Sequence, residues 1–125
     1  MTTEEGHVSA VVGWKAWLAA LALGVATLVV YLPVFQCSFV AYDDPTYVTA
    51  NSIVQSGLGV DGVAWAFTST VGGYWQPVTV LSHMADCSLF GMDPAAHHAM
   101  NLALHLANVL LLFGLLRALT GSVWR

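Results

Sequence analysis

The feature that most constrains this chain is a pair of long segments without a charged residue. The first covers residues 16–35 and the second covers residues 99–116. A helix rises about 1.5 Å per residue, so about twenty residues cross the roughly 30 Å hydrocarbon core of a bilayer. Backbone groups in that core need internal hydrogen bonds, which a helix supplies. The sequence therefore predicts an all-α integral membrane chain with two transmembrane helices.

The composition agrees with this class. Of the 125 residues, 58% are hydrophobic and 8% are charged, with a mean hydropathy of +0.72. An ordinary soluble domain carries about 25% charged residues. A net charge of −4 with only three basic residues argues against nucleic-acid binding and against a polybasic lipid-binding patch.

The first apolar segment has a signal peptide as its rival interpretation. Trp14 and Trp17 precede or begin it and Tyr31 lies near its end, where interfacial aromatic residues belong. The segment is too long for a signal h-region, and Glu4 and Glu5 stand where a basic n-region would be expected. An uncleaved span is the favoured interpretation.

The second span is expected within one helix over residues 94–120. Asp93 followed by Pro94 is typical of an N-cap and a first-turn proline, and Gly121 is a typical stop.

Polar residues interrupt this helix on one face. Asn101, His105 and Asn108 are spaced by four and then three residues, and His97 and His98 continue the stripe. Polar groups at membrane depth should face protein or a watery cavity. Helix–helix hydrogen bonding in a larger bundle is the favoured explanation, and a proton or substrate path is the alternative.

The basic residues predict the orientation. Lys15 precedes the first span, while Arg117 and Arg125 follow the second. The positive-inside rule places all three in the cytoplasm, and the acidic loop then faces the periplasm or exterior. The expected parts are a cytoplasmic tail (1–13), a first transmembrane helix (14–35), an extracytoplasmic loop (36–96), a second transmembrane helix (97–119) and a cytoplasmic end (120–125).

The loop is expected to contain short helices rather than to be a flexible tether. One should open at Asp44-Pro45 and run to about Ala50, and another should be capped by Asp61 and end before Gly72-Gly73. A longer helix should begin at Pro77, end at Phe90 and be closed by Gly91. On this third helix, one apolar side suited to the membrane surface is expected from Val78, Leu81, Ala85 and Leu89.

The acidic pair Asp43-Asp44 is the first candidate for chemistry. Adjacent side chains in extended chain point to opposite sides. If Asp44 caps the helix at Pro45, Asp43 is free to act as a general base toward a hydroxyl. The alternative is that both carboxylates only cap and solvate a turn.

Other candidates have simpler explanations. A metal site from His83, Asp86, Cys87, His97 and His98 is disfavoured, because no HExxH or CxxC spacing is present and the residues straddle a predicted helix break. No metal and no cofactor are expected.

Two further sets of residues leave alternatives open. Cys37 and Cys87 can be reduced and buried, which is favoured, or bonded in an oxidising compartment. The segment Tyr74-Trp75-Gln76-Pro77 can stack on a sugar or, more commonly, anchor at the lipid interface.

Taken together, four segments resemble one family. They are FVAYDDPTYVTAN (39–51), GVAWAFTST (62–70), YWQPVTVLSHMADCSLFG (74–91) and HHAMNLALHLANVLLLFGLLRALTGSVWR (97–125). In this order they resemble the N-terminal membrane region of bacterial relatives of the transmembrane-and-tetratricopeptide-repeat O-mannosyltransferases. That family has the multi-span GT-C glycosyltransferase fold.

The resemblance implies a bacterial inner-membrane enzyme that transfers a sugar, mannose-like, from a polyprenyl-phosphate donor to a Ser or Thr hydroxyl of a protein acceptor. It implies Asp43 as the base and Asp44 as its support. Donor binding would involve Tyr74, Trp75, Gln76, His97 and His98. Gln76 departs from an arginine expected in some animal relatives, which puts a phosphate-binding role there in doubt.

The family also implies parts that this sequence lacks. Its members have further transmembrane helices and tetratricopeptide repeats of about 34 residues, which would be partners of this segment. The chain is therefore expected to be an N-terminal fragment that is not catalytic alone. A noncatalytic interaction or scaffold protein of the same fold is the alternative, and a small transporter subunit is a third.

Overall fold

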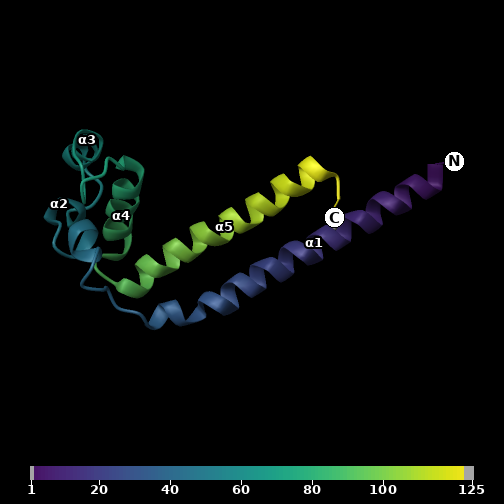
Figure 1. Ribbon diagram of the computed structural model, residues 1–125, viewed down its shortest axis with the longest axis horizontal. Helices are drawn as coiled ribbons and strands as arrows, with labels where there is room; N and C mark the ends of the chain where they lie inside the picture. Colours follow the sequence, from purple (N-terminus) through teal and green to yellow (C-terminus); the bar gives the residue numbers. More distant parts are fainter. Residues whose placement is uncertain (1, 123–125) are drawn as a thin grey trace. The chain divides into compact units, whose positions relative to one another are not determined.

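The computed structural model describes residues 2–122, with side chains from residue 13 onward. The described chain is all-helical and has no β-strand beyond one isolated bridge. Its helices are α1 (Thr2–Tyr31), a 3₁₀ helix (Leu32–Gln36), a π-helical turn (Pro45–Thr49), α2 (Ser52–Gln55), α3 (Val60–Thr68), α4 (Pro77–Phe90) and α5 (Pro94–Thr120). The chain divides into two compact units (Figure 1). The loop unit is Pro33–Asn101, and the long-helix unit contains the chain up to Leu32 and from Leu102 onward.

Two helical stretches are long and apolar enough to cross a membrane. They are Gly13–Gln36 and Pro94–Thr120, with mean hydropathies of 2.3 and 1.9. Large apolar side chains on them are exposed, including Trp17 at 78% and Leu111 at 70%. Apolar area costs free energy in water and none in hydrocarbon, so the two helices indicate membrane association. The expected spans, residues 14–35 and 97–119, lie within these stretches.

Within the long-helix unit, one member of the polar stripe has a partner. The ring of His105 meets the ring of Tyr31 edge-on, with centroids 5.0 Å apart. Asn101 and Asn108 are exposed. His97 was expected to continue this stripe, but its side chain is buried inside the loop unit.

The ends of α5 form as expected. Oδ1 of Asp93 accepts a hydrogen bond from the backbone N–H of Ala95 at 3.1 Å, and Pro94 is the first helical residue. Gly121 has φ of +64°, a left-handed conformation that glycine adopts without a Cβ clash. Local capping chemistry therefore accounts for both ends of the helix.

The loop unit has a hydrophobic core of its own. Its buried members come from the π-helical turn, α2, α3, α4 and the turn before α4, and they are Val48, Val54, Ala66, Val71, Val80, Met84 and Cys87. Helix α4 packs against α2, α3 and the π-helical turn (Figure 1). The prediction of an organised loop is therefore confirmed for the described residues.

Only one side of α4 packs into the core of the loop unit. Val80 and Met84 are buried, whereas Val78 and Leu89 are 76% and 66% exposed. Apolar residues occur on more than one side of this helix, so periodicity alone does not select a face. The neighbouring α2 and α3 make that selection by packing on the side of Val80 and Met84. Contact of the exposed side with a membrane surface stays a prediction.

Two expected N-caps are also corrected. Asp61 lies in the first turn of α3, and Gly59 holds the capping position. Asp44 precedes Pro45 as expected, but its backbone is already helical (φ −57°, ψ −34°) and its side chain makes no capping hydrogen bond. Helix α4 does begin at Pro77 and is closed by Gly91, as predicted.

Candidate functional site

The two carboxylates of the acidic pair have different environments. Oδ2 of Asp44 accepts a hydrogen bond from the backbone N–H of Val40 at 2.7 Å. The Asp43 side chain is exposed and makes no hydrogen bond within the described part of the chain. The backbone carbonyl of Asp43 accepts from the N–H groups of Thr46 and Tyr47 at 2.9 and 3.1 Å. A hydrogen-bonded turn therefore holds the backbone of Asp43 while its carboxylate stays open to solvent.

The expected structural role of Asp44 is found, but with a different partner from the one predicted. Asp44 is engaged in structure, as expected, but it binds the preceding segment through Val40 instead of capping the helix at Pro45. A charge-assisted bond to a backbone N–H is stronger than a neutral one. Asp44 is therefore bound to the segment that precedes the turn, whereas the carboxylate of Asp43 is exposed to solvent.

A second group of polar side chains lies where α4 meets the start of α5. His83 and Asp86 are on α4, and His97 is on the first turn of α5. One nitrogen or oxygen atom from each lies within 4.8 Å of the others. Nδ1 of His97 is 3.9 Å from Oδ2 of Asp86. We call these three residues the His–Asp–His cluster.

The cluster is buried and incompletely satisfied. Asp86 is 2% exposed and His97 is 3% exposed. Three of its atoms have no hydrogen-bond partner, namely Nδ1 of His83, Oδ1 of Asp86 and Nδ1 of His97. Buried polar side chains in folded proteins nearly always have a partner. The unpaired atoms therefore mark the cluster as a site that a cation or another polar group can complete.

Burial also changes the proton affinities in the cluster. Desolvation lowers the pKa of His83, an effect that the charges of Asp86 and Asp44 oppose and that of His97 reinforces. Desolvation raises the pKa of Asp86, and the charges of His97 and His83 oppose it. Of the acidic pair, Asp44 alone is among these charges, and its effect on the pKa of His83 is the smallest of the four.

Aromatic rings cover the two imidazoles. Phe39 meets His97 edge-on with centroids 5.3 Å apart, and the Tyr47 ring lies 6.4 Å from that of His83. The hydroxyl of Tyr47 in turn lies under Gly72, where a Cβ atom would approach it to 2.7 Å. Aromatic side chains from either side of the acidic pair therefore lie next to the cluster.

The residues of this cluster lie closer together than the sequence pattern predicts. The break between α4 and α5 was expected to separate the residues, but the short connection returns His97 to Asp86. Two sequence features could have indicated the cluster. His83 and Asp86 are three residues apart on one helix face, and His97 follows soon after a tight turn.

Cys87 and His98 do not belong to the cluster. Cys87 is a free thiol in the hydrophobic core, and burial followed by the charge of Asp86 raises its pKa. Cys37 is also free but is exposed, so the expectation of reduced, buried cysteines is met by Cys87 and is wrong about the burial of Cys37. Nε2 of the half-buried His98 is also without a partner.

The expected role of His97 in donor binding needs correction. The side chain is buried, and its Nε2–H donates to the carbonyl oxygen of Gly91 at 2.9 Å. It therefore offers no open surface to a lipid phosphate. His98, which is half-buried, keeps that role as a prediction.

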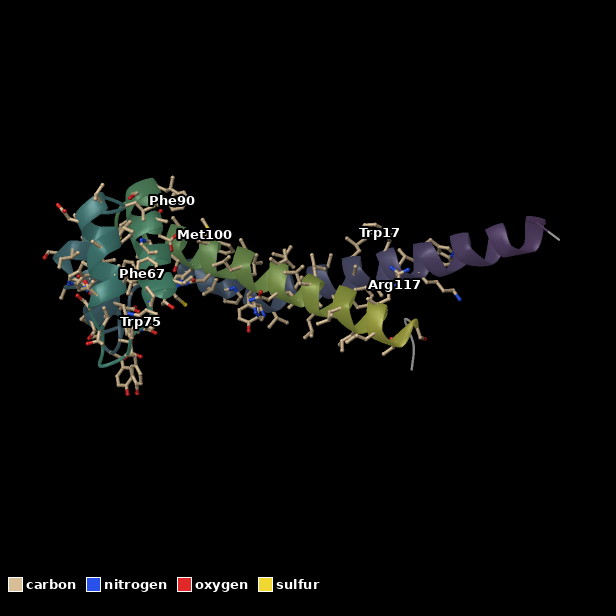
Figure 2. All side chains as sticks on the ribbon, turned by 90° about the horizontal axis from the view of Figure 1, so that it is seen from above. Trp17, Phe67, Trp75, Phe90, Met100 and Arg117 are labelled. Carbon is tan, nitrogen blue, oxygen red and sulfur yellow. The ribbon has the colours of Figure 1, made fainter. Side chains whose placement is uncertain are left out.

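The aromatic segment before α4 lies at the surface. Tyr74 and Trp75 are 70% and 63% exposed, and the indole N–H of Trp75 donates to the carbonyl oxygen of Phe67 at 2.9 Å (Figure 2). Gln76 holds the N-cap position of α4 without a side-chain capping bond. Among residues 13–122, no hydrogen bond or ring contact joins this segment to the acidic pair or the His–Asp–His cluster. The rings are available to a sugar or to a lipid interface.

Comparison with known proteins identifies no relative. No protein-family model matches the chain. No curated protein and no solved structure matches it either.

Proposed function

We propose that this chain is the N-terminal part of a GT-C-type membrane glycosyltransferase. It would transfer a mannose-like sugar from a polyprenyl-phosphate donor to a Ser or Thr hydroxyl of a protein. The proposal rests on the sequence resemblance, on two helices apolar enough to span a membrane, and on the acidic pair that follows the first of them. The remaining helices and repeats of such an enzyme would be its partners.

The observation that carries the proposal is the contrast between Asp43 and Asp44. Asp44 is engaged by the N–H of Val40 at 2.7 Å, whereas Asp43 is exposed on a turn that its own carbonyl oxygen stabilises. A general base needs an unengaged carboxylate in a held position. Asp43 meets both requirements.

In the proposed reaction, a carboxylate oxygen of Asp43 takes the proton of the acceptor hydroxyl. The hydroxyl oxygen then attacks the anomeric carbon and forms the new glycosidic bond. The bond from that carbon to the phosphate oxygen breaks, the configuration inverts, and the polyprenyl phosphate leaves with the electron pair. Tyr74 and Trp75 are suited to stack on the sugar, because their rings are exposed.

The test is an activity assay on the gene that encodes this chain together with any codons that follow. Membranes are incubated with radiolabelled polyprenyl-phosphate mannose and a Ser/Thr-rich peptide, and transfer to the peptide is counted. Asp43→Asn should lower transfer at least about 100-fold, the usual scale for loss of a general base. Asp61→Asn is the matched control, because it removes the same charge from an exposed position of the loop unit.

Either of two results would overturn the proposal. One is wild-type membranes that transfer no sugar while the protein is present. The other is an Asp43→Asn protein as active as Asp61→Asn. Both would favour the noncatalytic scaffold, since only the enzyme requires a carboxylate at residue 43.

A further inference from the structure

We propose that His83, Asp86 and His97 bind a divalent transition-metal ion that fastens α4 to the first turn of α5. All three residues lie in the loop unit, and metal binding there does not require sugar transfer. The hydrogen bonding of His97, the unpaired atoms around it and the chemistry of the three ligands support the site.

The hydrogen bond of His97 determines which ring nitrogen is available. Its Nε2 faces the carbonyl oxygen of Gly91 at 2.9 Å, and a carbonyl can only accept. The proton of a neutral imidazole is therefore on Nε2, and Nδ1 carries a lone pair. A backbone carbonyl on the other nitrogen is the usual support of a metal-binding histidine, because it holds the tautomer and the ring orientation.

The lone pair of His97 is on the side of a carboxylate. Nδ1 is 3.9 Å from Oδ2 of Asp86, and when Asp86 is ionised, as a metal ligand must be, neither atom has a proton to donate. Nδ1 of His83 and Oδ1 of Asp86 are buried and unpaired in the same place. A cation between these electron-pair donors satisfies all three side chains together.

The ligand set selects the kind of cation. Two imidazoles and one carboxylate suit Zn²⁺ and similar first-row ions, whereas Mg²⁺ and Ca²⁺ prefer oxygen ligands. The ligand atoms lie within 4.8 Å of one another. Tetrahedral bonds of about 2.0 Å place two ligands about 3.3 Å apart, so small side-chain rotations would close the site. Three protein ligands leave one coordination position for water or another ligand.

A simpler alternative makes different predictions. If His97 is protonated, it forms an ion pair with Asp86 and no metal is needed. His83 would then be an ordinary half-buried residue, and its replacement would not affect any metal binding. The role of His83 therefore separates the two explanations.

The experiment uses the full chain, purified in detergent and freed of metal with a chelator. Zn²⁺ is titrated by calorimetry, and Co²⁺ is added separately because tetrahedral cobalt has a strong visible absorption. The wild type should bind one ion per chain. His83→Gln and Asp86→Asn should each weaken Zn²⁺ binding by at least about 10-fold, the lower end of what even a supporting residue contributes. His105→Gln is the matched control, since that imidazole lies in the long-helix unit.

A second measurement guards against variants that fail to fold. X-ray absorption at the zinc edge of the wild-type chain should show nitrogen and oxygen ligands at about 2.0–2.1 Å and no sulfur at about 2.3 Å. Sulfur scattering would overturn the proposed ligand set in favour of a cysteine. The site would be overturned if the wild type and His83→Gln bound Zn²⁺ with equal affinity. It would also be overturned if His105→Gln lowered the Zn²⁺ affinity as much as His83→Gln does.

A stability measurement separates this inference from the proposed function. Zn²⁺ should raise the unfolding temperature of the wild type and of Asp43→Asn alike, and should not raise that of His83→Gln. Asp43 is outside the cluster, so failure of sugar transfer would leave this result unchanged. If Zn²⁺ leaves the wild-type unfolding temperature unaltered, the metal does not fasten the two helices.

Discussion

Nδ1 of His97 lies 3.9 Å from Oδ2 of Asp86, across the short connection between α4 and α5. Both side chains are buried. Within the loop unit, the contact therefore ties α4 to the first turn of α5.

The core of the loop unit should be sensitive to cavities on one side of α4. Met84 is fully buried, whereas Val78 on the same helix is 76% exposed. Met84→Ala should lower the free energy of unfolding of the loop unit by about 2–5 kcal/mol. Val78→Ala should change it by less than about 0.5 kcal/mol. Hydrogen exchange of the α4 amides measures both, and equal effects would contradict the observed burial.

In the turn before α4, replacement by alanine should be tolerated better at Gly73 than at Gly72. Gly72 and Gly73 have φ of +60° and +84°, and Cβ at Gly72 would come within 2.7 Å of the Tyr47 hydroxyl. Gly73 has no atom within 4 Å of that position. Gly73→Ala should cost about 1–2 kcal/mol from the left-handed backbone alone. Gly72→Ala should cost more, because the Tyr47 ring must move as well.

The same exchange experiment on peptides from α3 and α4 measures the two glycine variants. A larger loss of protection in Gly73→Ala than in Gly72→Ala would show that Tyr47 does not lie under the turn.

The two carboxylates of the acidic pair should contribute unequally to stability. Asp44 accepts from the N–H of Val40 at 2.7 Å, so Asp44→Ala removes that acceptor and should cost about 1 kcal/mol at this exposed position. Asp43→Ala should cost close to nothing. The hydrogen-exchange rate of the Val40 amide is the direct measurement. Faster exchange in Asp43→Ala than in Asp44→Ala would reverse the roles given to the two residues.

The cysteines offer a test of both burial and orientation. Cys37 is exposed just after the first apolar stretch, and Cys87 is buried with a raised pKa. Thiolates are the reactive form, so a membrane-impermeant maleimide should modify Cys37 in intact cells and reach Cys87 only after unfolding. Cys37→Ser is the control. Labelling of Cys37 only in inverted vesicles would place the loop unit in the cytoplasm and reverse the orientation predicted from Lys15 and Arg117.

Much of the helical architecture could be predicted from the sequence. The two apolar stretches, the start of α5 at Pro94, its stop at Gly121 and the limits of α4 all follow from length, proline position and glycine conformation. These are properties of a few consecutive residues, so neighbouring elements are not needed to determine them. The acidic pair could likewise be selected as a candidate because Asp43 and Asp44 are adjacent to a helix-opening proline.

Only the tertiary structure decided which side chains meet. It placed Val80 and Met84 on the core-facing side of α4 and brought His97 to Asp86. Each of these contacts depends on the packing of α2 and α3 or on the path of a turn, which spacing along one helix does not contain. Helix ends are set by short-range hydrogen bonds along the chain, whereas the His–Asp–His cluster exists because a turn and a shared core place residues from two helices together.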